Sequence, residues 1–200
     1  MGYMGSNGFV CGLFHEHKNT IFRLMKIKIL FVCHGNICRS PMAEFVMKKL
    51  VRDLPAESLA DIEFEIASAA TSTEEIGNPV YPPARRMLAM HGIDCSGKTA
   101  RQMTVRDYEY YDYIVLMDRN NLRNLRWILP ADVYARETGG AGSPTKNPSS
   151  HKVSLLMDWV GECRDVADPW YTGDFQATWD DVNAGCRAML SKIFVSCQEA

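Results

Sequence analysis

The sequence predicts a single α/β domain built on a doubly wound, four-stranded parallel sheet flanked by helices. Four short apolar segments alternate with helix-like segments along the chain, and the links between them are mostly short. The first segment, Ile27 to Val32, is apolar throughout, which is typical of a strand buried on both faces of a sheet. A length of 200 residues, with 46% hydrophobic and 23% charged residues, suits one globular domain with a sizeable core.

The first strand ends at Cys33, and a helix is expected from about Pro41 to Leu54. Ser40 is predicted to cap this helix, and proline suits the first helical position. The helix has an apolar face made by Met42, Phe45, Val46 and Leu50. Strand, short loop and helix therefore follow one another around Cys33.

The rest of the domain repeats this alternation. The second, third and fourth strands are expected at Phe64 to Ser68, Tyr113 to Met117 and Val153 to Trp159. Helices are expected at about Ala84 to Met90, from Asn120 to Trp127, and at about Phe175 to Val195. His91 and Gly92 suit the end of the helix before them, and Asp168 to Tyr171 is expected to form a polar turn.

Two segments are expected to lie outside this framework. Residues 1–24 have no clear periodicity and are predicted to be a flexible extension, leaving residues 25–200 as the domain. A loop insertion is expected at about 131–150, because Gly139, Gly140, Gly142 and two prolines occur there.

Composition excludes several classes of protein. A net charge of -2 gives no electrostatic reason to expect nucleic acid as a partner. No apolar run reaches the roughly 20 residues that a membrane span needs. The seven cysteines are scattered, which favours free thiols and a cytoplasmic location over a disulfide scaffold.

The loop after the first strand carries the chemistry. Cys33 is followed by Arg39 and Ser40 at the start of a helix, and backbone N–H groups, the helix dipole and the guanidinium there all favour a thiolate. Gly35 permits an unusual backbone that turns N–H groups inward. Arg39 can hold two oxygens of a phosphate group, and Ser40 can donate to the sulfur. The loop thus suits a tetrahedral dianion bound above a sulfur nucleophile.

A lone cysteine at a strand end is usually a small core residue, and the spacing to Arg39 is what favours the catalytic interpretation. The loop lacks the lysine of an ATP-binding loop and the glycines of a dinucleotide site. Phosphoryl transfer also needs a proton donor, for which Asp168 is the candidate. Trp170 and Tyr171 would then form an aromatic wall for a substrate ring.

The segments VCHGNICRSP and DPWYTGDF together resemble the low-molecular-weight protein tyrosine phosphatase family. SAATSTEEIGNP and YDYIVLMDRNNL match further segments of that family. The resemblance implies hydrolysis of phosphotyrosine proteins or peptides and of small aryl phosphates, with inorganic phosphate as product. It also implies that neither a metal nor an organic cofactor is needed; the oligomeric state stays open.

The resemblance assigns roles by position. Cys33 corresponds to the nucleophile, Arg39 to the phosphate clamp and Asp168 to the general acid. The phosphate oxygens would be bound by the loop backbone from His34 through Gly35, Asn36, Ile37 and Cys38 to Arg39. Asn36, Ser40 and Ser68 correspond to a supporting hydrogen-bond network, and Asp118 to a supporting aspartate. Cys38 corresponds to a loop cysteine that forms a reversible disulfide with the nucleophile.

Three positions depart from the family pattern. Glu74 stands where an aromatic residue is usual at the pocket rim, His34 replaces a small or aliphatic residue, and Lys98 replaces a histidine. Glu74 either disfavours acidic substrate flanks or is a solvated loop residue. These departures concern substrate preference rather than the reaction.

Three alternatives share the loop. A protein arginine phosphatase would carry threonine at the position of Ile37. An arsenate reductase would need two further cysteines in a shuttle segment, and residues 100–161 contain none. A phosphate-binding adaptor would have lost a catalytic residue, whereas Cys33, Arg39 and Asp168 are all present.

Overall fold

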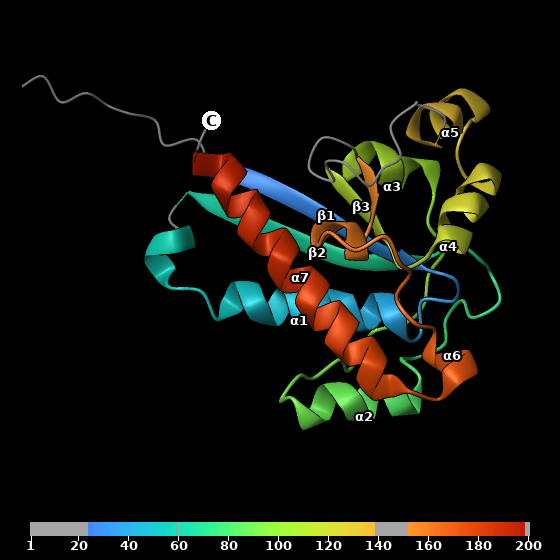
Figure 1. The fold of residues 1–200 in the computed structure, drawn as a ribbon, viewed down its shortest axis with the longest axis horizontal. Coiled ribbons are helices and arrows are strands. Elements are labelled where there is room, and N and C mark those ends of the chain that lie inside the picture. Colours follow the sequence, from blue (N-terminus) through green and yellow to red (C-terminus); the bar gives the residue numbers. More distant parts are fainter. Residues whose placement is uncertain (1–23, 60, 139–151, 199–200) are drawn as a thin grey trace, which may run out of the picture.

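A computed structural model describes residues 24–59, 61–138 and 152–198 of the chain. Four parallel strands form one sheet in the order β2-β1-β3-β4 (Figure 1). The strands are β1 at Met25–Cys33, β2 at Ile62–Ala70, β3 at Tyr113–Leu116 and β4 at Val153–Leu155. The predicted fold class is confirmed.

The sheet order places a topological switch point at β1. The chain passes from β1 to β2 on one side, and then returns to β3 on the other side of β1. Ile29 therefore pairs with Ile66 of β2 and with Tyr113 of β3. Ligands of such sheets bind beyond the carboxyl ends of the strands at this point, which here is Cys33.

The apolar run of β1 serves two cores. Ile29 and Phe31 face a core shared with α1 at Arg39–Arg52 and α7 at Phe175–Gln198. Leu30 and Val32 face the second core, to which the helices at Val105–Tyr110, Arg119–Asn124 and Ala131–Thr138 contribute. Successive side chains of a strand point to opposite faces, so the part of β1 that is covered on both sides, from Ile29 to Val32, has no polar position.

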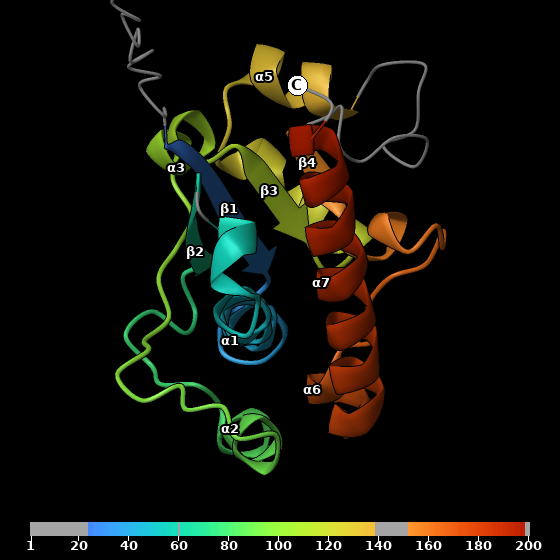
Figure 2. The ribbon, with the colours of Figure 1, turned by 90° about the vertical axis from the view of Figure 1, so that its left-hand side faces the viewer.

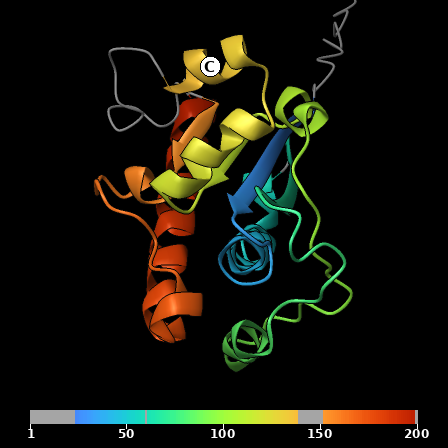
Figure 3. The same ribbon diagram turned by 90° about the vertical axis from the view of Figure 1, so that its right-hand side faces the viewer.

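The helices divide between the two faces of the sheet. Figure 2 shows α1 and α7 next to each other, and α2 at Pro82–Met90 contacts both of them. Figure 3 shows the other face, with α4 at Arg119–Asn124 and α5 at Ala131–Thr138. The third helix of that face, α3 at Val105–Tyr110, has a capping box between Thr104 and Asp107 and was not predicted.

The start of α1 differs from the prediction. The helix begins at Arg39 instead of Pro41, and the capping position is Cys38, which has no side-chain cap hydrogen bond. Ser40 is not the cap, because its hydroxyl is already engaged with the loop that precedes the helix.

Three other segments differ from their predicted structure. The prediction of a loop insertion at 131–150 is wrong for its first part, because α5 covers Ala131–Thr138 and contacts the second core through Val133 and Tyr134. Residues 139–151 lie outside the described residues. The fourth strand stops at Leu155, and Met157–Trp159 is a 3-10 turn. The predicted turn after Asp168 is a short helix, α6 at Pro169–Thr172.

The end of α2 agrees with the prediction. His91 is the C-cap residue, and Gly92 has a positive φ of 69°. The imidazole of His91 also stacks on Trp179 of α7, with ring centroids 3.7 Å apart.

The extension predicted at residues 1–24 lies, except for Leu24, outside the described residues. In the part of the chain that is described, no helix combines the length and apolar character that crossing a membrane requires.

Candidate active site

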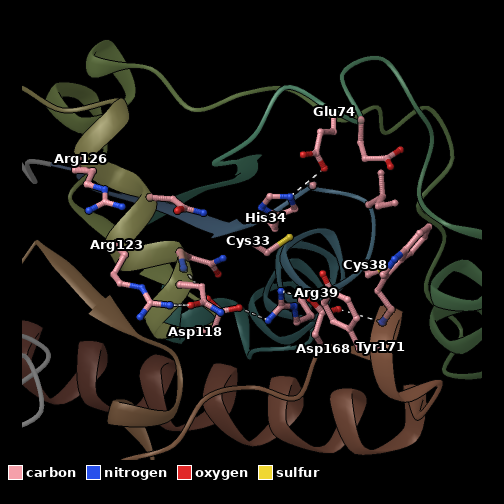
Figure 4. A pocket seen from close by; sticks show the side chains of 17 residues that line it. Cys33, His34, Cys38, Arg39, Glu74, Asp118, Arg123, Arg126, Asp168 and Tyr171 are labelled. Atoms are coloured by element: carbon pink, nitrogen blue, oxygen red, sulfur yellow. Dashed lines mark hydrogen bonds and ion pairs between the residues drawn. The ribbon is translucent and has the colours of Figure 1, made fainter.

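A pocket of about 580 Å³ opens at the carboxyl end of β1 (Figure 4). Its floor is the loop that starts at Cys33 and ends at Arg39. Its walls come from Glu74 and Glu75 after β2, from α4 after β3, and from the segment Asp168 to Tyr171 after β4. Parallel strands bring these four segments together although they are far apart in sequence.

The sulfur of Cys33 lies at the base of this pocket. The backbone N–H of Asn36 points at the sulfur, 3.3 Å away, and the hydroxyl oxygen of Ser40 is 3.1 Å from it. The Cys33 residue is only 3% exposed. The loop therefore folds around the sulfur, directs the N–H of Asn36 toward it and places the Ser40 hydroxyl in contact with it.

Asn36 holds the shape of the loop. Its amide donates to the hydroxyls of Ser40 and Ser68, each at 2.8 Å, and its Oδ1 accepts from the backbone of Arg101 at 3.2 Å. Asn36 also has the left-handed backbone of the loop, with a φ of 58°. Asparagine tolerates this conformation better than most residues, and these three hydrogen bonds hold it there.

The unusual backbone had been predicted at Gly35, and that prediction is wrong. Gly35 has no positive φ. A Cβ atom at Gly35 would lie 3.1 Å from the Cγ atom of Glu75 in the neighbouring pocket wall, so a larger residue there would require the Glu75 side chain to shift.

The network continues behind the loop to a buried carboxylate. The hydroxyl of Ser68 donates to Glu44 at 2.6 Å, and the ammonium of Lys98 lies 2.9 Å from the same carboxylate oxygen. Lys48 binds the other oxygen of Glu44. Burial alone would raise the pKa of Glu44, but the two lysines and the serine hydroxyl hold it below its usual value.

Glu44 was not singled out from the sequence. The available signal was a glutamate among the apolar residues Met42, Ala43, Val46 and Met47 of the predicted helix, four residues before a lysine. Lys98, which was noted as a departure from the family pattern, is the cation that neutralises Glu44 from outside the helix.

Arg39 is almost completely buried beneath the pocket and is held by two carboxylates. Its Nη1 donates to Asp118 at 2.6 Å, and its Nη2 donates to Asp168 at 2.5 Å. Burial alone would lower the pKa of Arg39, but Cys33 and the two carboxylates raise it above its usual value. The guanidinium is thus a fixed positive charge next to the sulfur.

The two carboxylates are themselves positioned by helix starts. Asp118 is the N-cap of α4 and accepts from the backbone of Asn121 at 2.6 Å. Asp168 is the N-cap of α6 and accepts from the backbone of Trp170 at 3.0 Å. One oxygen of each aspartate caps a helix and the other meets Arg39, so both predicted aspartates reach the site.

The predicted rim residues also line the pocket. Trp170 and Tyr171 are exposed at 55% and 84%, and Trp170 contacts the ring of Tyr81 with centroids 5.2 Å apart. On another wall, Nε2 of His34 lies 3.1 Å from Glu74. The structure therefore places an aromatic surface and a histidine–glutamate pair at the entrance (Figure 4).

Cys38 lines the same pocket as Cys33. Burial, reinforced by the nearby Cys33, raises the pKa of the Cys38 thiol to about 12. Cys38 is therefore a protonated thiol at neutral pH.

Asn36, Ser40 and Ser68 lie behind the pocket, whereas the other predicted site residues line it. Sequence reasoning missed one complete wall, which is made by Asn120, Asn121, Arg123, Asn124 and Arg126. Over the described residues, no three histidine, cysteine, aspartate or glutamate side chains are grouped to hold a metal ion.

The arrangement suits a tetrahedral anion. The Cys33 sulfur is contacted by the N–H of Asn36 and the hydroxyl of Ser40, and the buried guanidinium of Arg39 and the carboxylate of Asp168 line the same pocket. Such a set can bind a phosphate group and support nucleophilic attack by sulfur.

Comparison with known proteins agrees with this geometry. Residues 28–198 match the protein family described as "Low molecular weight phosphotyrosine protein phosphatase". The chain is 37% identical over 169 residues to the low molecular weight protein-tyrosine-phosphatase YfkJ of Bacillus subtilis, covering 84% of this chain and 96% of that protein. It is also 37% identical over 169 residues to the mouse low molecular weight phosphotyrosine protein phosphatase, covering 83% of this chain and 95% of that protein.

Solved structures show the same fold. The crystal structure of YfkJ from Bacillus subtilis superposes with a TM-score of 0.67 at 34% identity, covering 84% of this chain and 94% of that chain. A Drosophila arginine phosphatase superposes with a TM-score of 0.64 at 27% identity, covering 84% of this chain and 98% of that chain.

Proposed function

Because the chain belongs to the low molecular weight phosphotyrosine protein phosphatase family, we propose that it hydrolyses phosphotyrosine in proteins and peptides, and small aryl phosphates. The reaction passes through a cysteinyl-phosphate intermediate and releases inorganic phosphate. Cys33 is the nucleophile, Arg39 the phosphate clamp and Asp168 the general acid. One observation carries the proposal: the Cys33 sulfur, the Arg39 guanidinium and Asp168 line one pocket, and the N–H of Asn36 points at the sulfur from behind it.

The first step begins with binding of the phosphate dianion. Its oxygens are bound by backbone N–H groups between His34 and Arg39 and by the guanidinium. In the structure that guanidinium donates to Asp168. The arriving dianion competes for the same Nη2, so substrate binding frees the Asp168 carboxyl group to carry a proton.

Sulfur then attacks phosphorus in line with the tyrosyl oxygen. The S–P bond forms as the P–O bond breaks, and Asp168 gives its proton to the leaving oxygen. Ser40 donates to the sulfur when it leaves in the second step, and Arg39 and the loop stabilise the charge spread over the equatorial oxygens.

The second step restores the enzyme. Water attacks phosphorus, Asp168 accepts its proton, and the P–S bond breaks to give the Cys33 thiolate and inorganic phosphate. Asp118 keeps Arg39 in place throughout, because its contact is with the other guanidinium nitrogen, Nη1.

Phosphate release from matched phosphotyrosine, phosphoserine and phosphoarginine peptides tests the proposal. The expected result is turnover of phosphotyrosine at mildly acidic pH and its loss in Cys33→Ser, because oxygen at this site is a far weaker nucleophile than a thiolate. Normal release by Cys33→Ser would exclude the assigned nucleophile.

Arginine phosphatase activity is the alternative, and the similarity to the Drosophila enzyme is the observation that favours it. Ile37, which lines the pocket, stands where threonine was expected for that activity. Faster release from phosphoarginine than from phosphotyrosine would decide for the alternative, and Ile37→Thr should shift the ratio toward phosphoarginine.

A cytoplasmic location is part of the proposal. Five cysteines are free in the described part of the chain, which is typical of a reducing compartment. Protein substrates carrying phosphotyrosine are the expected partners.

A further inference from the structure

The pocket has a wall that the proposed reaction does not use. Arg123 and Arg126 both line it, and they come from the end of α4 and the 3-10 turn at Leu125–Trp127. They are three residues apart, which places them on the same side of a helical segment. Figure 4 shows them together on one side of the pocket, with Cys33 near the centre and Glu74 and Tyr171 on the other side.

These two arginines are available to bind a ligand. Both are exposed, and in the part of the chain that is described neither has a carboxylate partner. Arg123 donates to the side-chain oxygen of Asn120, which orients the guanidinium without neutralising it. Arg126 lies over the ring of Trp127, 4.9 Å from its centroid, which likewise leaves its charge in place.

Other arginines at this end of the sheet differ in this respect. Arg39 is bound by Asp118 and Asp168, and Arg119 of the same helix is paired with Asp165 at 3.2 Å. The uncompensated charges therefore occur on the pocket wall.

The opposite wall is acidic. Glu74 and Glu75 both line the pocket there, and Nε2 of His34 lies 3.1 Å from Glu74. The entrance is thus positive on the α4 side and negative on the other side, with the phosphate loop between them. A substrate whose charges are unevenly distributed about the phosphotyrosine fits such an entrance best.

We propose that Arg123 and Arg126 form a second anion subsite, which selects phosphotyrosine substrates that carry another carboxylate or phosphate group on one side of the phosphotyrosine. The inference rests on the proposed function, because it names the substrate class of the same pocket. Guanidinium groups bind carboxylate and phosphate with the same planar geometry, so the shared chemistry is an oxyanion.

Steady-state kinetics on a matched set of phosphotyrosine peptides tests the subsite. One peptide has alanine flanks, two carry a pair of aspartates before or after the phosphotyrosine, and two carry a phosphoserine in those places. For the wild type, kcat/KM for one placement of the anion should exceed that of the alanine peptide by about three- to ten-fold, as expected for exposed charge pairs. Comparing kcat/KM of the phosphoserine peptides with that of the aspartate peptides shows whether phosphate or carboxylate is preferred.

Variants locate the effect. In the double variant Arg123→Gln/Arg126→Gln, the ratio of kcat/KM for the anionic peptide to that for the alanine peptide should fall to near one. In Arg123→Lys/Arg126→Lys, part of the preference should remain. Arg106→Gln removes an exposed arginine on α3, outside this pocket, and should keep the wild-type ratio. The wild-type preference should also shrink as salt is raised, because exposed charges are screened.

Two results would overturn the subsite: equal kcat/KM for every peptide in the wild type, or an unchanged preference in the double glutamine variant. Failure of the proposed function looks different, since the alanine peptide would then release no phosphate. In that case fluorescence anisotropy of the anionic and alanine peptides on the Cys33→Ser protein still tests the subsite. Equal affinities would overturn it.

Discussion

At the scale of single residues, the contact between Asp168 and Arg39 conflicts with the proposed role of Asp168 as the general acid. Asp168 binds Arg39 at 2.5 Å, and the proposed reaction needs its carboxyl group free and protonated. Asp118 has no such conflict, because it holds Nη1 of the same guanidinium and caps α4. Asp118 is therefore a permanent support for Arg39, whereas Asp168 competes with the incoming phosphate for the guanidinium.

Asp168→Ala should slow the first step most for substrates with poor leaving groups. Loss of a general acid costs about 10²- to 10⁴-fold, and the cost shrinks when the leaving phenol needs no proton. The measurement is kcat for a series of aryl phosphates plotted against the pKa of the free phenol, which should give a steeper slope in the variant. Asp165→Asn, an exposed aspartate paired with Arg119, is the control and should keep the wild-type slope.

Cys38 should protect Cys33 from irreversible oxidation. Peroxide oxidises Cys33 to a sulfenic acid. Cys38 then attacks that sulfur while its thiol proton passes to the departing hydroxide, which gives water and a disulfide that dithiothreitol reduces. After the same peroxide treatment, the fraction of activity restored by dithiothreitol should be smaller in Cys38→Ser than in the wild type. Equal recovery would argue against the role, and Cys163→Ser, at an exposed site outside the pocket, should recover as the wild type does.

At the scale of elements, α1 carries both a reactive loop at its start and a buried ion pair that supports the loop. Glu44 is 4% exposed and links Lys98 to Ser68, which in turn bonds to Asn36. The loop geometry therefore depends on a lysine that approaches from a segment more than 50 residues further along the chain.

Lys98→Met should lower the free energy of unfolding by up to about 3 kcal/mol, because it leaves a buried carboxylate with Lys48 as its remaining cation. Urea unfolding is the measurement. Lys49→Met is the control: it removes the exposed pair between Lys49 of α1 and Asp53. It should lower the free energy of unfolding by less than about 1 kcal/mol. Equal losses for the two variants would contradict a structural role for Lys98.

The same carboxylate predicts a dependence of stability on pH. The pKa of Glu44 is lower in the folded protein than its usual 4.5, so its contribution is complete above that value and is lost as pH falls toward the folded pKa. Unfolding midpoints measured between neutral pH and about pH 3 should therefore fall less steeply in Glu44→Gln than in the wild type. A parallel decline would show that other carboxylates dominate the acid sensitivity.

At the scale of the whole molecule, the long helix α7 covers one face of the sheet, and its Gly185 lies close to Leu156, the residue after β4. A Cβ atom there would lie 2.5 Å from Cγ of Leu156. Gly185→Ala should therefore destabilise the protein by about 1–3 kcal/mol through overpacking, although alanine favours a helix.

The control for that variant is Ala184→Gly at the neighbouring exposed position of α7, where propensity alone should cost about 1 kcal/mol. Thermal or urea unfolding measures both. A stabilised Gly185→Ala protein would show that α7 can move away from Leu156 without loss.

Much of the fold and the centre of the site could be predicted because their determinants are local. An unbroken apolar run before Cys33 indicates a strand buried on both faces, and the loop to Arg39 is short enough for its residue types to define a phosphate cradle. Asp168 could be found because a carboxyl group next to proline and two aromatic residues is itself a local signal. The predictions that were wrong, such as the cap at Ser40 and the loop at 131–138, concern residues whose state depends on distant contacts.

The sequence by itself therefore determined the α/β class, the order of the strands along the chain, and the cysteine, arginine and aspartate at the site. The tertiary structure alone decided that two carboxylates meet Arg39, that Lys98 reaches Glu44, and that Arg123 and Arg126 line the pocket. The physical reason is the sheet order β2-β1-β3-β4, which brings the carboxyl ends of distant strands to one edge. Spacing along a chain specifies a loop, whereas the neighbours of that loop are specified by how the sheet is assembled.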